Sequence, residues 1–306
     1  MRHNNSSSNR QPQRQPIRAK KSLGQNFLHS QKALHQIIKA ADLQIDETVV
    51  EIGPGKGALT HELLKAGCKV IAIELDNRLI PYLQKAFKPA LITERLILIH
   101  GDALHTDFSE YLDNPNTSQA ISETRVKRDL QTPESGSEYF KVVANIPYYI
   151  TSPLITRLLL EQYEINQLPQ KIVLLTQKEV AEKICDPEYD SVISLSVKLF
   201  GTPKLVATVP ASAFSPAPNV DSAIIEISDI KAPDKELNCR QLIKLIKQGF
   251  KAPRKKIMNN LLATLRLEKE EAQKRLENAG IDPNLRPEKL NIEDWKTILP
   301  QFEDRL

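Results

Sequence analysis

A glycine-rich loop, Gly53-Pro54-Gly55-Lys56-Gly57-Ala58, follows directly on a short apolar run at residues 49–52. Glycines at such a turn let the backbone approach a bound ligand with no side chain in the way. We therefore expect a nucleotide-like cofactor to bind here, with Gly53 and Gly55 among its contacts. The spacing fits two classes of cofactor-binding enzyme, so the loop alone leaves both open.

Two carboxylates follow the next two apolar runs. Glu74 comes about 20 residues after the loop, where a carboxylate can accept hydrogen bonds from both ribose hydroxyls of a cofactor. NAD and S-adenosylmethionine both carry that ribose. The loop also fits both glycine patterns, the G-x-G-x-G of methyltransferases and the G-x-G-x-x-A variant of dinucleotide-binding enzymes. Asp102, in Gly101-Asp102-Ala103, adds an acceptor suited to an adenine amine, for which dehydrogenases have no general need. The alternative for Asp102 is a turn-forming residue after a strand.

The sequence Asn145-Ile146-Pro147-Tyr148, at the end of a further apolar run, is the most specific feature of the chain. An adenine amine is a poor nucleophile because its lone pair is delocalised into the ring, so an enzyme must orient it with acceptors on the amine protons. The Asn145 side-chain oxygen and a backbone carbonyl at Ile146 or Pro147 can supply those acceptors, in a turn that Pro147 stiffens. Tyr148 can stack on an extruded base. An ordinary Asn-x-Pro turn would not explain the sheet edge shared with Glu74.

Two further features bear on the chemistry. Phe214, in the Pro-rich stretch 210–218, could form the opposite wall of a base pocket or simply pack inward as a loop aromatic. If the cofactor is S-adenosylmethionine, no general base is required before methyl transfer, because the positive charge on its sulfur vanishes as the methyl group leaves.

Three well separated cysteines indicate neither a disulfide framework nor a metal site, so we expect no metal and a reducing, cytoplasmic location.

Apolar runs that alternate with helical stretches must position these residues, and they predict a doubly wound α/β sheet. The candidate parallel strands are residues 49–52, 69–73, 95–99, 141–144 and 171–175. Residues 205–209 and 222–227 have no helix between them, so we expect an antiparallel pair that closes the sheet. The polar stretch 112–138 indicates a surface insertion.

The domain organisation follows from length and composition. At 306 residues, with 41% hydrophobic and 26% charged residues, the chain should form one large globular domain and a smaller one. We expect a disordered basic tail at 1–20, the sheet domain at 21–232 and a small α-helical domain at 233–306. No apolar run is long enough to span a membrane. The tail could contact RNA phosphates, resemble an organelle transit peptide, or be inert.

The helical domain carries a concentration of positive charge. Residues 237–267 contain eight Lys or Arg and no Asp or Glu. Four of the basic residues recur at helical spacing and three extend the run: Arg240, Lys244, Lys247, Lys251, Arg254, Lys255 and Lys256. We predict that this stretch contacts RNA phosphates in a salt-sensitive way, although a solvated helix face is the alternative.

Together these motifs resemble the ribosomal RNA adenine dimethyltransferase family of the KsgA type, over residues 20–300. The resemblance implies a Rossmann-like class I methyltransferase fold with S-adenosylmethionine as cofactor. The motifs that carry it are Leu23-Gly24-Gln25-Asn26-Phe27-Leu28, Glu51-Ile52-Gly53-Pro54-Gly55, Glu74-Leu75-Asp76, Gly101-Asp102-Ala103, Asn145-Ile146-Pro147-Tyr148, Gln177-Lys178-Glu179-Val180 and Phe214-Ser215-Pro216-Ala217-Pro218-Asn219-Val220-Asp221-Ser222-Ala223.

The resemblance also implies roles for individual residues and a substrate. The implied roles are that Asn26 and Leu28 cover the cofactor, Gly53 lies under its methionine part, Glu74 holds the ribose, Asp102 with the neighbouring Ala103 holds the adenine, and Asn145 joins cofactor to target. The implied substrate is two adjacent adenines near the 3′ end of small-subunit (16S) ribosomal RNA, each methylated twice in an immature subunit. We expect the protein to act as a monomer.

Three alternatives stay open at this point. The sister group that methylates a large-subunit adenine and confers macrolide resistance shares the Asn-Ile-Pro-Tyr element, although the 23–28 motif favours the small-subunit group. An NAD-dependent dehydrogenase would share the glycine loop and Glu74 but not Asn145 to Tyr148. A non-catalytic ribosome assembly factor could use the same fold. The chain departs from the family in the tail, in the 112–138 insertion and in Tyr189-Asp190-Ser191-Val192-Ile193-Ser194-Leu195-Ser196.

Overall fold

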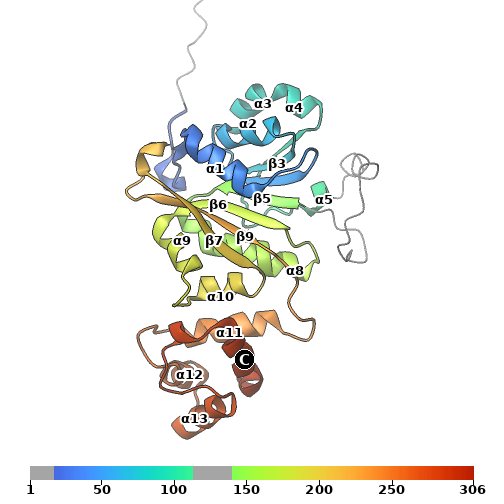
Figure 1. The fold of residues 1–306 in the computed structure, drawn as a ribbon. Coiled ribbons are helices and arrows are strands. Elements are labelled where there is room, and N and C mark those ends of the chain that lie inside the picture. The colour runs from blue at the N-terminus through green and yellow to red at the C-terminus, as the bar shows by residue number, and fades with distance from the viewer. Residues whose placement is uncertain (1–16, 113–139) are drawn as a thin grey trace, which may run out of the picture.

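Figure 1 shows the fold, a computed structural model that describes residues 17–112 and 140–306. The predicted basic tail lies outside the described residues as far as residue 16, and the predicted polar insertion does so from residue 113 onward. Within the described ranges, no helix is both long and apolar enough to cross a lipid bilayer.

A seven-stranded sheet forms the centre of the molecule, in the order β4-β3-β2-β5-β6-β9-β7. Its strands are β2 (Thr48–Ile52), β3 (Lys69–Glu74), β4 (Leu96–His100), β5 (Phe140–Asn145), β6 (Lys171–Gln177), β7 (Thr202–Val209) and β9 (Ser222–Ser228). Strands β2 to β6 are parallel, whereas β9 is antiparallel to both β6 and β7. The doubly wound sheet and the closing antiparallel pair are confirmed, with strand ends displaced by at most three residues.

Both faces of the sheet are covered, which is why its strands are almost continuously apolar. Successive side chains point to opposite faces: Val50 and Ile71 belong to one buried cluster, and Val49 and Ala72 to the other. The first cluster packs against α5 (Ser109–Leu112), α7 (Thr151–Thr156), the π-helix Arg157–Glu161, α8 (Gln162–Glu164), α9 (Lys178–Cys185) and α10 (Val192–Lys198). The second cluster packs against α1 (Gln31–Ala41), α2 (Ala58–Lys65) and α4 (Lys88–Ile92). Helix α3 (Ile80–Ala86) comes just before α4 in the chain.

A second, two-stranded sheet was not predicted. Strand β1 (Phe27–Leu28) pairs antiparallel with β8 (Phe214–Ser215) and so joins the two ends of the sheet domain. Short helical turns complete the described chain: η1 (Lys21–Leu23), η2 (Tyr148–Ile150), η4 (Ala211–Ala213), η5 (Pro287–Lys289), η6 (Leu299–Gln301) and η7 (Glu303–Arg305).

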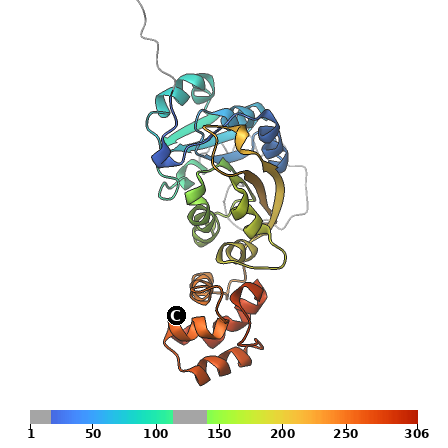
Figure 2. The ribbon, with the colours of Figure 1, turned by 90° about the vertical axis from the view of Figure 1, so that its left-hand side faces the viewer.

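The C-terminal part is helical, as predicted, and forms the orange-to-red group at the bottom of Figures 1 and 2. Its helices are α11 (Cys239–Gly249), α12 (Ile257–Leu265), α13 (Lys269–Asn278) and α14 (Ile292–Ile298). Trp295 is fully buried at its centre, where Gly249 allows close approach because a Cβ there would lie 2.2 Å from the Trp295 ring. The domain boundary between residues 232 and 233 stays a prediction.

The helical group packs against α10 and the loop before it. The Asp190 amide donates a hydrogen bond to the Glu288 carbonyl oxygen (2.8 Å), and the Lys289 ammonium lies 3.7 Å from the centre of the Tyr189 ring. Buried residues of α11, α12 and α14 continue the apolar cluster of the sheet's first face. The stretch 189–196, which departs from the family pattern, therefore lies at the contact between the two parts of the molecule.

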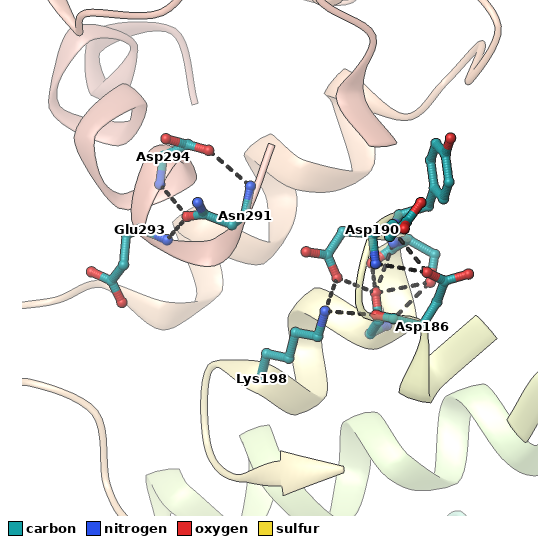
Figure 3. Close-up of polar contacts among 10 residues, drawn as sticks. Asp186, Asp190, Lys198, Asn291, Glu293 and Asp294 are labelled. Carbon is teal, nitrogen blue, oxygen red and sulfur yellow. Dashed lines mark hydrogen bonds and ion pairs between the residues drawn. The ribbon is translucent and has the colours of Figure 1, made fainter. Parts of the chain in front are cut away.

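Figure 3 shows how each side of this contact is fixed locally. The Lys198 ammonium donates to the Asp190 carboxylate (2.7 Å) and to the Asp186 carbonyl oxygen (3.2 Å), which ties α10 to the loop. On the facing side, the Asn291 side chain caps α14 by accepting from the Glu293 and Asp294 amides (2.8 and 3.1 Å).

Candidate active site

One cavity collects the residues with predicted cofactor-binding or base-binding roles. It lies at the carboxyl ends of the parallel strands, where ligands bind in open α/β sheets. The predicted residues that line it are Asn26, Leu28, Gly53, Gly55, Glu74, Asp102, Ala103, Asn145, Ile146, Pro147, Tyr148 and Phe214. Side chains that are more than a hundred residues apart in sequence thus share one site.

The glycine loop turns sharply from β2 into α2. Gly53 and Gly55 have φ of 69° and 60°, a left-handed conformation that glycine adopts without steric cost. The Gly55 amide donates to Glu74 Oε2 (3.0 Å), and the Asp76 amide donates to Glu74 Oε1 (2.8 Å). Burial raises the pKa of the Glu74 carboxyl, and these two N–H groups oppose the increase. Since each carboxylate oxygen has two lone pairs, Glu74 can still accept from two ligand hydroxyls.

Asp102 lies in the loop that follows β4. Its Oδ1 accepts from the Leu104 amide (2.9 Å), while its Oδ2 makes no hydrogen bond with any described residue. The buried Arg157 guanidinium, from the π-helix, donates to the Ala103 and Thr106 carbonyl oxygens. Arg157, which no sequence signal indicated, therefore holds the loop that presents a free acceptor to the cavity.

The Asn145 side chain has a defined orientation. Its Nδ2 donates to the Asn26 carbonyl oxygen (3.3 Å), so its Oδ1 is left as an acceptor without a partner among the described residues. The Pro147 carbonyl has one lone pair engaged by the Ile150 amide (3.2 Å), whereas the Ile146 carbonyl accepts no backbone hydrogen bond among the described residues and is the more available second acceptor. Of the two backbone acceptors left open by the sequence, the geometry thus favours Ile146.

An N-terminal strap, residues 20–28, lies along the cavity. Gln25 Nε2 donates to Asp76 Oδ2 (2.8 Å), which ties the strap to the segment just after β3. Pairing of β1 with β8 ties it to Phe214, and the Phe27 ring lies 4.7 Å from the Lys56 ammonium. These contacts explain how Asn26 and Leu28 reach the cavity, which spacing alone could not indicate.

Glu51 lines the same cavity, although no role was predicted for it. It is only 1% exposed, and its Oε2 has no hydrogen-bond partner among the described residues. Burial raises the pKa of its carboxyl to about 8, and the nearby Glu74 charge adds to the increase. An acid within an otherwise apolar strand was the available signal, because such a group is rarely buried without a reason.

The predicted basic residues are all exposed, but they differ in their contacts. Arg240 forms an ion pair with Glu164, and Lys244 donates to the Leu306 carbonyl oxygen. The prediction that the helical face continues to Lys251 is wrong: α11 ends at Gly249, and Pro253 disfavours helix at the residue before it. The remaining residues form what we call the basic surface: Lys247, Lys251, Arg254, Lys255 and Lys256.

The fold and the cavity together define a class of protein. In dinucleotide-binding sheets the strand order is 3-2-1-4-5-6, whereas here the antiparallel β9 lies between β6 and β7. This sheet, with its glycine loop and successive carboxylates, is that of a Rossmann-like class I methyltransferase.

Comparison with known proteins gives the family. A model of the family described as ribosomal RNA adenine dimethylase matches residues 17–304, so the chain belongs to that family. It is 39% identical to the ribosomal RNA small subunit methyltransferase A of Dehalococcoides mccartyi, covering 94% of this chain and 89% of the relative. It is 37% identical to the protein of the same name from Clostridium botulinum, covering 90% of each chain.

Solved structures agree with this assignment. A dimethyladenosine transferase from Plasmodium falciparum is 26% identical, with a TM-score of 0.67 over 91% of this chain and 98% of that chain. The 23S rRNA methyltransferase ErmE is 23% identical, with a TM-score of 0.61 over 91% of this chain and all of that chain, and so shares the fold.

Proposed function

We propose that this protein transfers methyl groups to the N6 amine of two adjacent adenines near the 3′ end of small-subunit ribosomal RNA, giving N6,N6-dimethyladenosine. The observation that carries the proposal is the orientation of Asn145. Its Nδ2 is tied to the strap, and its Oδ1 remains an acceptor at the cavity that also contains Glu74 and Asp102.

The cavity suits S-adenosylmethionine. When bound, this cofactor supplies an electrophilic methyl group on a positively charged sulfur. Glu74 would hold the ribose hydroxyls, because its carboxylate has lone pairs left after accepting from Gly55 and Asp76. Asp102 Oδ2 would accept from the adenine amine, with Ala103 beside the ring, and Gly53 would lie against the methionine part. Asn26 and Leu28 of the strap would cover the cofactor.

The turn after β5 would hold the target amine. Asn145 Oδ1 and the Ile146 carbonyl would each accept one amine proton, which directs the nitrogen lone pair toward the reacting carbon. Tyr148 would stack on the extruded adenine, and Phe214 would form the opposite wall. The amine then loses its proton to water, so the residues of the turn need not act as a base.

The basic surface would bind the RNA. Lys247, Lys251, Arg254 and Lys255 make no side-chain hydrogen bond or ion pair within the described part of the chain, and the Lys256 ammonium donates to the neutral side chain of Asn284 (2.7 Å). Their charges are therefore available to phosphates. Arg240 and Lys244, which already have partners, would contribute less. We further propose that the substrate is an immature subunit and that the protein acts as a monomer in the cytoplasm.

Methyl transfer to purified RNA tests the proposal. The protein is incubated with S-adenosylmethionine carrying a tritiated methyl group and with immature small subunits or large-subunit RNA, and the nucleosides are identified by mass spectrometry. We expect N6,N6-dimethyladenosine in small-subunit RNA alone. Transfer only to large-subunit RNA would favour the macrolide-resistance type, and subunit binding without transfer would favour an assembly factor.

A further inference from the structure

The hydroxyl of Tyr148 lies 2.7 Å from the hydroxyl of Ser222, a residue 74 positions away in the sequence. Ser222 is fully buried and is the first residue of β9. It pairs with Gln177 of β6 on one side and Val209 of β7 on the other, so two neighbouring strands fix its position.

Tyr148 is also fixed at its backbone. The Thr151 hydroxyl donates to the Tyr148 carbonyl oxygen (2.9 Å) and lies 2.7 Å from the hydroxyl of Thr176 on β6. Both threonines are buried. Tyr148 is therefore held both at its hydroxyl and at its backbone carbonyl, while its ring lines the cavity.

A tyrosine fixed in this way is suited to stacking rather than to proton transfer. Its hydroxyl is engaged by Ser222, and burial raises the pKa of Tyr148, so the phenol stays neutral. With its hydroxyl held, the side chain cannot swing away about its Cα–Cβ bond, and a base that arrives on a ring already in position loses less entropy.

We propose that Ser222 is a positioning residue, whose hydroxyl holds the Tyr148 ring in the position in which the target adenine stacks. This inference rests on the proposed function, in which Tyr148 is the stacking surface. It assigns a purpose to the buried serine in the Phe214 to Ala223 motif.

A double-mutant cycle tests the inference. Ser222→Ala, Tyr148→Phe and the double variant are compared for kcat and KM with small-subunit RNA, for cofactor Kd by calorimetry, and for Tm. We expect each single variant to lower kcat by about 3- to 10-fold, the range of one hydrogen bond. The double variant should fall no further, because both changes remove the same contact. Ser228→Ala, at the other end of β9, is the matched control and should leave kcat unchanged.

The possible outcomes separate this inference from the proposed function. Wild-type kcat in Tyr148→Phe, which keeps the ring and leaves the core untouched, would overturn the positioning role, as would losses that multiply in the double variant. Tyr148→Ala reports on the stacking surface itself. If Tyr148→Ala is inactive while the other variants are normal, only the role of Ser222 is wrong. If Tyr148→Ala is fully active, the proposed base pocket is wrong as well.

Discussion

The cavity and the basic surface are built in opposite ways. In the cavity, the side chains proposed to hold the target base are fixed by partners from distant segments, as Asn145 is by the Asn26 carbonyl and Tyr148 is by Ser222. On the basic surface, Lys247 and Lys255 extend from the helical group without polar side-chain partners among the described residues. The difference indicates that the cavity depends on exact geometry, whereas the surface depends on summed charge. Changes in the cavity should therefore act on kcat, and changes on the surface on RNA affinity.

Replacing Asn145 should give the largest effect. Asn145→Ala removes one aligned acceptor, and we expect kcat to fall about 10²–10³-fold, or ~3–4 kcal/mol in the barrier, by analogy with loss of one oriented hydrogen bond in other enzymes. RNA affinity and Tm should change little. Asn259→Ala, at an exposed position of α12, is the control. A kcat within a few-fold of wild type would contradict the view that the cavity depends on exact geometry, because the cavity would then tolerate loss of its central contact.

The pH dependence of stability should reveal Glu51. Burial raises the pKa of Glu51 to about 8, so the folded state favours the neutral carboxyl. Below the pKa of Glu51 in the unfolded chain, the free energy of unfolding is at its full value. It falls as pH rises toward and through 8, because the unfolded chain can then ionise this group and the folded chain resists doing so. Between pH 5 and pH 8 the free energy of unfolding should fall by about 3–4 kcal/mol more in the wild type than in Glu51→Gln. Urea unfolding at both pH values measures this difference. Parallel pH profiles of the two proteins would show that Glu51 is not held neutral.

Charge reversal on the basic surface should have the smallest effect. Lys255→Glu combined with Lys256→Glu should weaken RNA binding about 10-fold at moderate salt and flatten the dependence of log K on log salt by about 2, since two phosphate contacts are lost. Cofactor affinity and kcat at saturating RNA should not change. Lys204→Glu on β7 changes charge elsewhere and is the control. Unchanged RNA affinity, or an equal loss in the control, would contradict the assignment.

The sheet could be predicted because its signal is local. Continuous apolar runs such as residues 49–52 identify strands covered on both faces, and the carboxyl ends of parallel strands meet at one edge. That rule is sufficient to bring Glu74, Asp102 and Asn145 together at the same edge. The strands β1 and β8 were missed because two residues are too few for a periodic pattern.

The contacts that orient the site could not be predicted, because they join distant segments. Nothing in the sequence links Tyr148 to Ser222, or Arg157 to the Ala103 carbonyl. Lys251 was placed on a helix because its spacing fits, but spacing does not show where a helix ends. Glu51 was overlooked because the sequence shows a single acid in an apolar run but not how deeply its carboxyl is buried.

A crystal structure with S-adenosylhomocysteine and a short RNA that contains the two adenines tests the central claim most directly. The account predicts one adenine stacked on Tyr148, with Asn145 Oδ1 and the Ile146 carbonyl oxygen both within hydrogen-bonding distance of its N6. An Asn145 side chain turned away from N6, or an adenine bound outside the cavity, would contradict it.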